Sequence, residues 1–247
     1  MPRSAHVADG EGGVMNNPGN YFTGIVDFFA GDGAYDLDDV ARGGIVAAFA
    51  KCSEGVTIQD RGYVDAMVRL KAAGMLRGAY HFGKGTSDAE EQARVYCDDL
   101  RAIVDDPDDI LPCLDLEGDP KLHGTMSTAD AARFITSVRA RLGRWPVLYM
   151  GLSKGRARMR VATQHERETL TRCPLWLAAY GEMPAPDAVP GWSAWSLWQY
   201  TNGVDGPHDR VHFPRLTDGF LHREKQDRSS FRGTAAELRT WWSTCGR

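Results

Sequence analysis

Leu111-Pro-Cys-Leu-Asp-Leu-Glu-Gly-Asp119 is the stretch of the sequence that decides the fold. Read as a β-strand, it alternates its side chains between two faces. One face begins apolar and ends in the carboxyl groups of Asp115 and Glu117, just before a glycine ends the strand. The other face carries Leu114 and Leu116, and we expect it to pack against covering helices. In parallel α/β barrels, catalytic side chains lie at the carboxyl ends of strands, so the pattern predicts a site there.

The spacing of Asp115 and Glu117 favours acid–base chemistry. Residues i and i+2 of a strand have α-carbons roughly 6–7 Å apart. At that range two carboxyl groups repel each other, so we expect Asp115 to stay ionised and Glu117 to hold its proton. Enzymes that hydrolyse a glycosidic bond use such a pair, one protonated carboxyl group as general acid and one ionised carboxylate beside it. A strand end where two acidic residues simply meet water is the alternative, and the rest of the chain must decide.

Composition excludes several classes of protein. The chain has 247 residues, which suffice for one large α/β domain or two small ones. The formal net charge is −4, and no basic cluster indicates binding to nucleic acid. The 43% hydrophobic and 25% charged residues are typical of a globular protein, and no apolar run reaches the length of a membrane span. We expect a monomer.

The chain is expected to hold a single catalytic domain. Residues 1–21 are rich in Gly, Asn and small polar residues and predict a flexible N-terminal arm, without the apolar core of a secretory signal. Residues 22–247 show no repeat or linker that would set off a second domain. The five cysteines are odd in number and widely spaced, which argues against a disulfide framework or a zinc knuckle.

Strand-like and helical segments alternate along most of this domain. The predicted strands are 24–29, 45–51, 76–82, 111–117, 146–150, 175–180 and 195–201, and the segment 226–230 makes the number seven or eight. The predicted helices are 36–42, 60–74, 87–104 capped by Ser87, 127–143, 163–171 and 234–243. This alternation indicates parallel strands joined by right-handed crossovers, and so many strands favour a barrel. Helical segments thin out after the fifth or sixth strand, which predicts an incomplete helical ring.

Seven short motifs follow one another between residues 22 and 243. They are Gly24-Ile-Val-Asp27, Ala50-Lys-Cys-Ser-Glu-Gly55 with Asp60, Gly78-Ala-Tyr-His-Phe82, Leu114-Asp-Leu-Glu117, Leu175-Trp-Leu-Ala-Ala-Tyr180, Leu197-Trp-Gln-Tyr-Thr201 and Asp227-Arg-Ser-Ser-Phe231. Any one of them is weak, but in this order they resemble glycoside hydrolase family 25, the Chalaropsis-type lysozymes or N-acetylmuramidases. One departure is Phe28-Phe29-Ala30-Gly31, where the family usually has Ser-His-Trp, and it leaves the substrate contacts on that rim open.

The resemblance implies a TIM-like (β/α)5(β)3 barrel and a bacteriolytic enzyme. Its substrate is expected to be peptidoglycan, cut outside the cytoplasm at the β-1,4 bond after N-acetylmuramic acid, without a cofactor. The resemblance also carries over four acidic site positions, with Glu117 matching the catalytic acid. These positions are Asp27, Asp115, Glu117 and Asp227.

Other polar and aromatic residues near predicted strand ends are candidates for substrate contact, because aromatic rings stack on sugars. They are Tyr80, Tyr149, Trp176, Tyr180 and Gln199, with Trp198 as a further candidate for the wall of the site. Packing inside the barrel is the alternative for each aromatic ring. Lys51 and Glu54 are equally consistent with an ion pair on the rim and with a site role. His81 fits a hydrogen-bonded wall residue better than a base.

No metal is expected in the site. His208 and His212 have the i, i+4 spacing that binds zinc on a helix, but prolines at 207 and 214 place them in a loop. No third ligand is evident, and we assign no role to these residues or to His222.

The proposed chemistry follows from Asp115 and Glu117 lying on one wall. A retaining enzyme with a protein nucleophile needs its two carboxyl groups on opposite faces of the scissile bond. We therefore predict that the 2-acetamido group of the substrate is the nucleophile, with net retention. Glu117 protonates the leaving oxygen, and Asp115 holds the acetamido N–H. A sugar-binding barrel without catalysis and a glycosidase acting on chitin are the alternatives.

Overall fold

The fold is a closed barrel of eight strands, seen in a computed structural model that describes residues 21–32, 40, 43–103, 109–118, 124–206 and 227–247. The order around the barrel is β1 (Tyr21–Phe28), β9 (Asp227–Arg232), β8 (Leu197–Thr201), β7 (Leu175–Ala178), β6 (Val147–Gly151), β5 (Ile110–Asp115), β4 (Leu76–Phe82) and β2 (Ala47–Glu54). Pairing of β1 with β2 closes the ring, and β3 (Ile58–Gln59) adds to β2 as a short hairpin. The predicted barrel is confirmed.

One strand departs from the predicted parallel arrangement. Seven strands of the barrel run parallel, whereas β9 is antiparallel to both of its neighbours, β1 and β8. The chain enters β9 at the end of the barrel where β8 leaves it, so β9 runs backwards. In consequence its first residue, Asp227, lies at the carboxyl end of the other strands, opposite Asp27.

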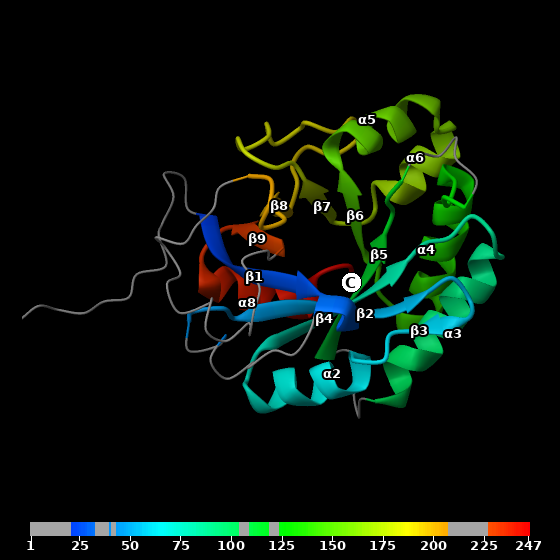
Figure 1. Cartoon of the computed structure of the whole chain (residues 1–247). Helices are drawn as coiled ribbons and strands as arrows, with labels where there is room; N and C mark the ends of the chain where they lie inside the picture. Colours follow the sequence, from blue (N-terminus) through cyan, green and yellow to red (C-terminus); the bar gives the residue numbers. More distant parts are fainter. Residues whose placement is uncertain (1–20, 33–39, 41–42, 104–108, 119–123, 207–226) are drawn as a thin grey trace, which may run out of the picture.

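Helices cover only part of the barrel. The helices α2 (Tyr63–Ala72), α3 (Ala89–Ala102), α4 (Thr128–Leu142), α5 (Leu152–Val161) and α6 (Gln164–Leu170) lie around the outside of β2 to β7 (Figure 1). Residues 179–196, which connect β7 to β8, contain no helix, as the incomplete ring predicts. A short 3-10 helix, η1 (Ala30–Asp32), follows β1.

The helix boundaries follow capping chemistry. Ser127 caps α4 by accepting a hydrogen bond from Asp130 N, and Gly143, with φ of 72°, ends it as predicted. The predicted cap of α3 is wrong by one residue, because the Asp88 carboxylate, not Ser87, accepts from the first free amides. Apart from residue 40, the helix predicted over 36–42 lies outside the described residues, as does the predicted N-terminal arm except for Tyr21 in β1.

Two apolar layers line the strands. Leu114 and Leu116 pack in the outer layer, between the barrel and its helices. Leu111 and Cys113 pack in the barrel interior, so the predicted two faces of this strand are confirmed. All five cysteine side chains are buried as free thiols. In the described part of the chain, no helix combines the length and the apolar character of a membrane span.

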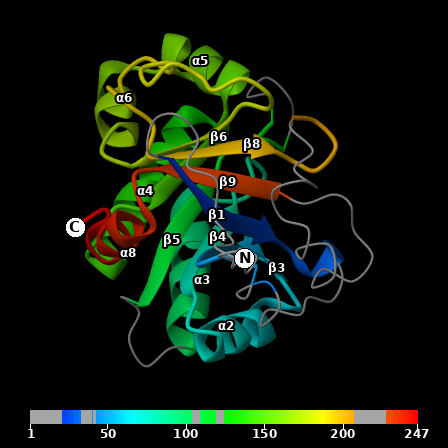
Figure 2. The same ribbon diagram turned by 90° about the vertical axis from the view of Figure 1, so that its left-hand side faces the viewer.

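The last helix closes the amino end of the barrel. Figure 2 shows α8 (Ala235–Thr244) at the end from which β1 and β8 start. Trp242 of α8 packs in the barrel interior and donates a hydrogen bond from Nε1 to Arg77 O at 2.9 Å. The buried guanidinium of Arg144 donates to Trp242 O at 2.9 Å and to Cys245 O at 2.7 and 3.0 Å. The interior is therefore filled at this end.

Candidate active site

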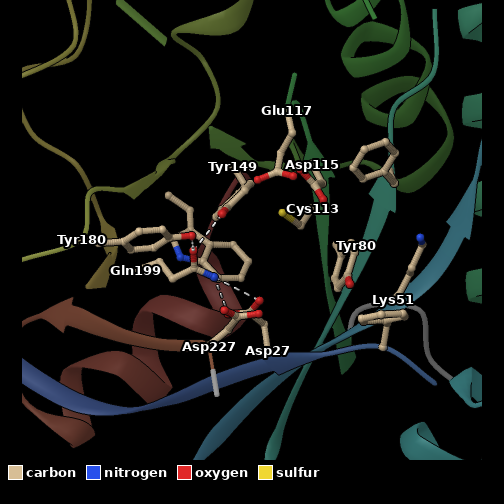
Figure 3. A pocket seen from close by; sticks show the side chains of 13 residues that line it. Asp27, Lys51, Tyr80, Cys113, Asp115, Glu117, Tyr149, Tyr180, Gln199 and Asp227 are labelled. Atoms are coloured by element: carbon tan, nitrogen blue, oxygen red, sulfur yellow. Dashed lines mark hydrogen bonds between the residues drawn. The ribbon is translucent and has the colours of Figure 1, made fainter. Parts of the chain in front are cut away.

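A pocket of about 260 Å³ lies at the carboxyl ends of the parallel strands. Its lining residues are Asp27, Phe29, Lys51, Tyr80, Phe82, Cys113, Asp115, Glu117, Tyr149, Trp176, Tyr180, Gln199 and Asp227 (Figure 3). All nine site residues predicted from the sequence are among them. The structure thus brings together in one pocket residues that are spread over 200 positions of the chain.

The four carboxyl groups form two pairs on opposite walls. Asp115 ends β5, and Glu117 follows two residues later. Asp27 of β1 and Asp227 of β9 are directly opposite each other in the antiparallel register. In the ring of eight strands β9 is four strands from β5 in either direction, so the two pairs face each other across the pocket (Figure 3).

Gln199 of β8 orders one side of the pocket. Its Nε2 donates to both carboxylate oxygens of Asp27, at 3.1 and 3.0 Å. Its Oε1 accepts from Tyr149 Oη at 2.8 Å and from Tyr180 Oη at 3.1 Å. One amide group therefore holds an acid and two phenols in place, and its orientation is fixed by donors on one side and an acceptor on the other.

The Asp27–Asp227 pair favours binding a proton. Burial raises the pKa of Asp27 well above its usual value, the charge of Asp227 adds to this, and the hydrogen bond from Gln199 opposes it. Burial raises the pKa of Asp227 to about 7, with further contributions from Asp32 and Glu117. Two like charges in register across neighbouring strands cannot both ionise without cost, so one proton is retained near neutral pH.

The Asp115–Glu117 pair is held differently. Asp115 is buried, and burial raises its pKa, followed by the charge of Glu117, while Lys51 opposes the rise. Glu117 reaches solvent at the mouth of the pocket, yet desolvation by the surrounding walls raises its pKa, and a hydrogen bond with Tyr149 opposes this. The expected ionised Asp115 beside a protonated Glu117 is therefore too simple, because burial raises the pKa of both groups and they compete for a proton.

A lysine lines one side of the pocket, and a second lysine shares its ion-pair partner. Lys51 Nζ lies 2.6 Å from Glu54 Oε2, and Lys84 Nζ lies 2.8 Å from Glu54 Oε1. Both ammonium groups also approach the ring of Phe82, at 5.3 and 5.0 Å from its centroid. Lys51 and Glu54 thus form the ion pair left open by the sequence, and Lys51 also lines the pocket. Its charge favours the ionised form of Asp115.

The two tryptophans predicted for the wall have different positions. Trp176 lines the pocket, with its ring edge-on to Tyr149 at 4.9 Å between centroids. The prediction for Trp198 is wrong, because strand alternation turns it away from its neighbour Gln199 and into the outer layer. There Trp198 Nε1 donates to Ala179 O at 2.7 Å.

His81 lies behind the pocket wall rather than in it. Its Nδ1 is 2.9 Å from Ser53 Oγ, and its Nε2 is 3.1 Å from Gln92 Oε1. Gln92 Oε1 is an acceptor that also receives Lys84 N, so Nε2 carries the proton and Nδ1 accepts from the serine hydroxyl. Burial lowers the pKa of His81 to about 4. The predicted hydrogen bonds are confirmed, but the neutral imidazole lies behind the wall and does not line the pocket.

Sequence reasoning missed some residues of the site. Phe29, Phe82 and Cys113 line the pocket, and Arg158 of α5 lies beneath the turn that carries Glu117. No sequence pattern distinguishes Arg158 from the other basic residues of its helix. His208, His212 and His222 lie outside the part of the chain that the structure describes. Within the described part, no group of three or more His, Cys, Asp or Glu side chains is arranged to hold a metal ion.

The profile of the glycosyl hydrolases family 25 matches residues 26–207. The chain belongs to glycosyl hydrolase family 25. The matched segment includes Asp27, Asp115 and Glu117 but ends before Asp227, whose place in the pocket comes from the structure. Lysozyme M1 of Streptomyces globisporus is 26% identical over 193 residues, which are 73% of this chain. The match spans 64% of that relative, less than two thirds of its length.

Solved structures of the same fold include other glycosyl hydrolase family 25 proteins. A bacterial lysozyme from Streptomyces coelicolor superposes with a TM-score of 0.71 at 23% identity, over 93% of this chain and 99% of that one. A family GH25 lysozyme from Aspergillus fumigatus gives a TM-score of 0.67 at 23% identity, over 90% and 98% of the two chains. At these identities the comparison establishes the shared barrel.

Proposed function

We propose that the chain is a lysozyme that hydrolyses the β-1,4 bond between N-acetylmuramic acid and N-acetylglucosamine in peptidoglycan. The observation that carries the proposal is the pocket, in which four carboxyl groups with raised pKa values meet in a family 25 barrel. Carboxyl groups that keep a proton near neutral pH supply the general acid that glycoside hydrolysis needs. The enzyme acts as a monomer on the cell wall, outside the cytoplasm.

Glu117 is the general acid in this proposal. It is the member of its pair that reaches solvent, at the mouth of the pocket, where a glycosidic oxygen can approach. Its pKa is raised by desolvation, so a protonated fraction persists above the usual range of a carboxyl group. Asp115 lies deeper, below the position that the sugar ring would occupy.

Asp115 orients the 2-acetamido group of the substrate, which acts as the nucleophile. Asp115 lines the pocket, and its Oδ1 accepts no hydrogen bond from the described residues, so the carboxylate keeps acceptor capacity for the acetamido N–H. Both oxygens of Asp27, in contrast, already accept from Gln199. Attack by the acetamido oxygen with departure of the leaving alcohol, protonated by Glu117, gives an oxazolinium ion. Water then attacks the anomeric carbon of this ion and gives a proton back to the Glu117 carboxylate, which restores the acetamido group and the acid with net retention.

Digestion of purified peptidoglycan tests the proposed activity. The products are reduced with borohydride and analysed by mass spectrometry, and new reducing ends on N-acetylmuramic acid are expected. Glu117→Gln serves as the matched control, because a contaminating hydrolase would be unaffected by it. Ends on N-acetylglucosamine, or cleavage of chitin alone, would replace muramidase by another glycosidase. Binding without release of fragments would leave a sugar-binding barrel.

Two further measurements test the proposed mechanism. Proton NMR of the first-formed product should show the β-anomer, and inversion would exclude acetamido participation. Glycan that lacks the N-acetyl group on the cleaved residue should react at least about 10²-fold more slowly, because an oriented internal nucleophile is a large rate term. Equal rates would instead point to a protein carboxylate, and Asp227 on the opposite wall is then the first candidate.

A further inference from the structure

A buried arginine lies under the turn that carries Glu117. Arg158 of α5 is 0% exposed. Its guanidinium donates from one terminal nitrogen to Met126 O at 2.8 Å, and from the other to Glu117 O at 3.1 Å and Gly118 O at 3.4 Å. One side chain therefore joins the turn after β5 to the residue that precedes the cap of α4.

Among the described residues, no strand of the barrel forms a backbone hydrogen bond with Glu117. The strand β5 ends at Asp115, and the next residue makes the last inter-strand hydrogen bond, from Leu116 N to Tyr149 O at 3.0 Å. Beyond it the chain turns at Gly118, whose φ is 77°. A β-carbon there would lie 2.8 Å from Thr125 Oγ1, so the turn is packed tightly against Thr125. The carbonyls of this turn need donors, and Arg158 provides them.

We propose that Arg158 is the positioning residue for Glu117, through the backbone of the turn and without touching substrate. Arg158 is not among the residues that line the pocket, which agrees with an indirect role. A guanidinium suits this task, because its planar fork presents several donors in fixed directions. The expected effect of Arg158 on turnover rests on the proposed function, in which Glu117 is the general acid. Its effect on the placement of the Glu117 carboxyl group does not, and it can be measured without substrate.

The chain contains a matched control for this arginine. Arg144 is also buried, at 1% exposure, and its guanidinium also donates to backbone carbonyls, those of Trp242 and Cys245. Its contacts hold α8 against the amino end of the barrel, at the end opposite to the pocket. Loss of either arginine removes a buried guanidinium from its carbonyls, but only Arg158 is next to the turn of Glu117.

The test compares Arg158→Met, Arg158→Lys and Arg144→Met. Melting temperature, kcat and KM on peptidoglycan are measured, and the titration of the Glu117 carboxyl carbon is followed by NMR without substrate, assigned with Glu117→Gln. Arg158→Met should lower kcat about 10- to 100-fold with KM within twofold, because small misplacements of catalytic groups cost this much. The pKa of Glu117 should fall toward its ordinary value, because a side chain that is no longer held in place becomes more exposed to solvent.

The other variants separate positioning from folding. Arg158→Lys keeps donors for the same carbonyls and should recover part of kcat and of the Glu117 titration. Arg144→Met should lower the melting temperature while kcat and the Glu117 titration stay unchanged. If Arg158→Met does not fold, Arg158→Lys carries the test, and wild-type kcat with an unchanged titration in it overturns the proposal. So does a folded Arg158→Met that loses only stability. If the wild type does not cut peptidoglycan, the proposed function fails, and the titration alone decides the role of Arg158.

Discussion

At the carboxyl end of the barrel four carboxyl groups face one pocket, whereas at the amino end the interior is filled by α8 and closed with apolar side chains. At the first end, burial works against the charged forms of the residues, and all four pKa values are raised. At the second end, Trp242 and Arg144 have their polar atoms hydrogen-bonded to backbone carbonyls.

The two ends of the barrel thus differ in the role of their residues: those at the open end are suited to catalysis, and those at the closed end stabilise the fold. Carboxyl groups with raised pKa values lower the stability of the folded state at neutral pH, and four of them meet where the barrel is open. Residues that fill the interior are concentrated where it is closed. Variants at the open end should therefore change rate without a loss of stability, and variants at the closed end should lose stability with little effect on rate.

The sharpest test of this contrast is the same substitution at both ends. Glu117→Gln keeps the volume of the side chain but removes the acidic proton, so activity should fall roughly 10²–10⁴-fold without a fall in the melting temperature. Glu237→Gln, in the capping box of α8, should keep full activity. Turbidity assays on cell walls and thermal melts measure both. More than a tenth of wild-type activity in a folded Glu117→Gln would remove Glu117 from its role.

Truncation at the closed end should affect stability alone. Trp242→Ala removes a ring that is 3% exposed, so the free energy of unfolding should fall by about 3–5 kcal/mol. Trp241→Ala, on the neighbouring and less buried side chain, is the control and should cost less. Urea unfolding gives the free energies, and kcat per folded molecule should stay within twofold of wild type. A large fall in kcat would mean that the two ends are coupled.

Removing the buried charge beside Glu117 should move the pH profile. A general acid must be protonated, so the alkaline limb of activity follows the pKa of Glu117. Asp115 and Glu117 compete for a proton, so the last proton of the pair is lost against the charge of its partner. Asp115→Asn removes that partner, lowers the pKa of Glu117 and should shift the limb to lower pH. Asp98→Asn, on the exposed side of α3, removes an equal charge far from the pocket and should not shift it. A stationary limb in Asp115→Asn would show that the pair is not coupled.

The smallest expected effect is a gain in stability at the open end. Burial raises the pKa of Asp227 to about 7, against an ordinary value of 3.8, so the folded state binds this proton more tightly than the unfolded state. Stability then falls as pH rises from about 4 to 7, since the unfolded chain loses its proton first. Asp227→Asn should raise the melting temperature at pH 8 by several degrees and leave it unchanged at pH 4. Equal melting temperatures of wild type and Asp227→Asn at pH 8 would show that burial of the ionised Asp227 does not destabilise the fold. Asp187→Asn, in an exposed loop, is the control and should not change the melting temperature.

Sequence patterns predicted the parts of the molecule that depend on local periodicity. The two faces of β5 followed from alternation. Eight of the nine predicted pocket residues came from the motifs, and Tyr149 came from its place near the end of a predicted strand. Trp198 was misplaced because the motif containing Gln199 joins residues from both faces of β8. Strand alternation, applied to each residue of this motif, assigns Gln199 to the interior face and Trp198 to the outer face.

The remaining features depend on contacts that no local pattern encodes. The buried residues of α5 are Gly155, Arg158 and Met159, so its sequence lacks an apolar stripe and the helix was missed. Arg158 contacts backbone carbonyls, which leave no mark on the identity of the residues that carry them. The reversed direction of β9 depends on where its connection re-enters the barrel, and strand propensity does not determine this.

Reversal of β9 also has a consequence for folding during synthesis. Asp27 and Asp227 are 200 positions apart and meet only when β9 fills the gap between β1 and β8. Until the ribosome releases that strand, β1 and β8 have unpaired edges that invite association with other chains. Contacts between such distant segments form slowly, so ring closure is expected late in folding. The step that closes the ring also brings the last acid into the pocket, so the pocket is complete only in the fully folded chain.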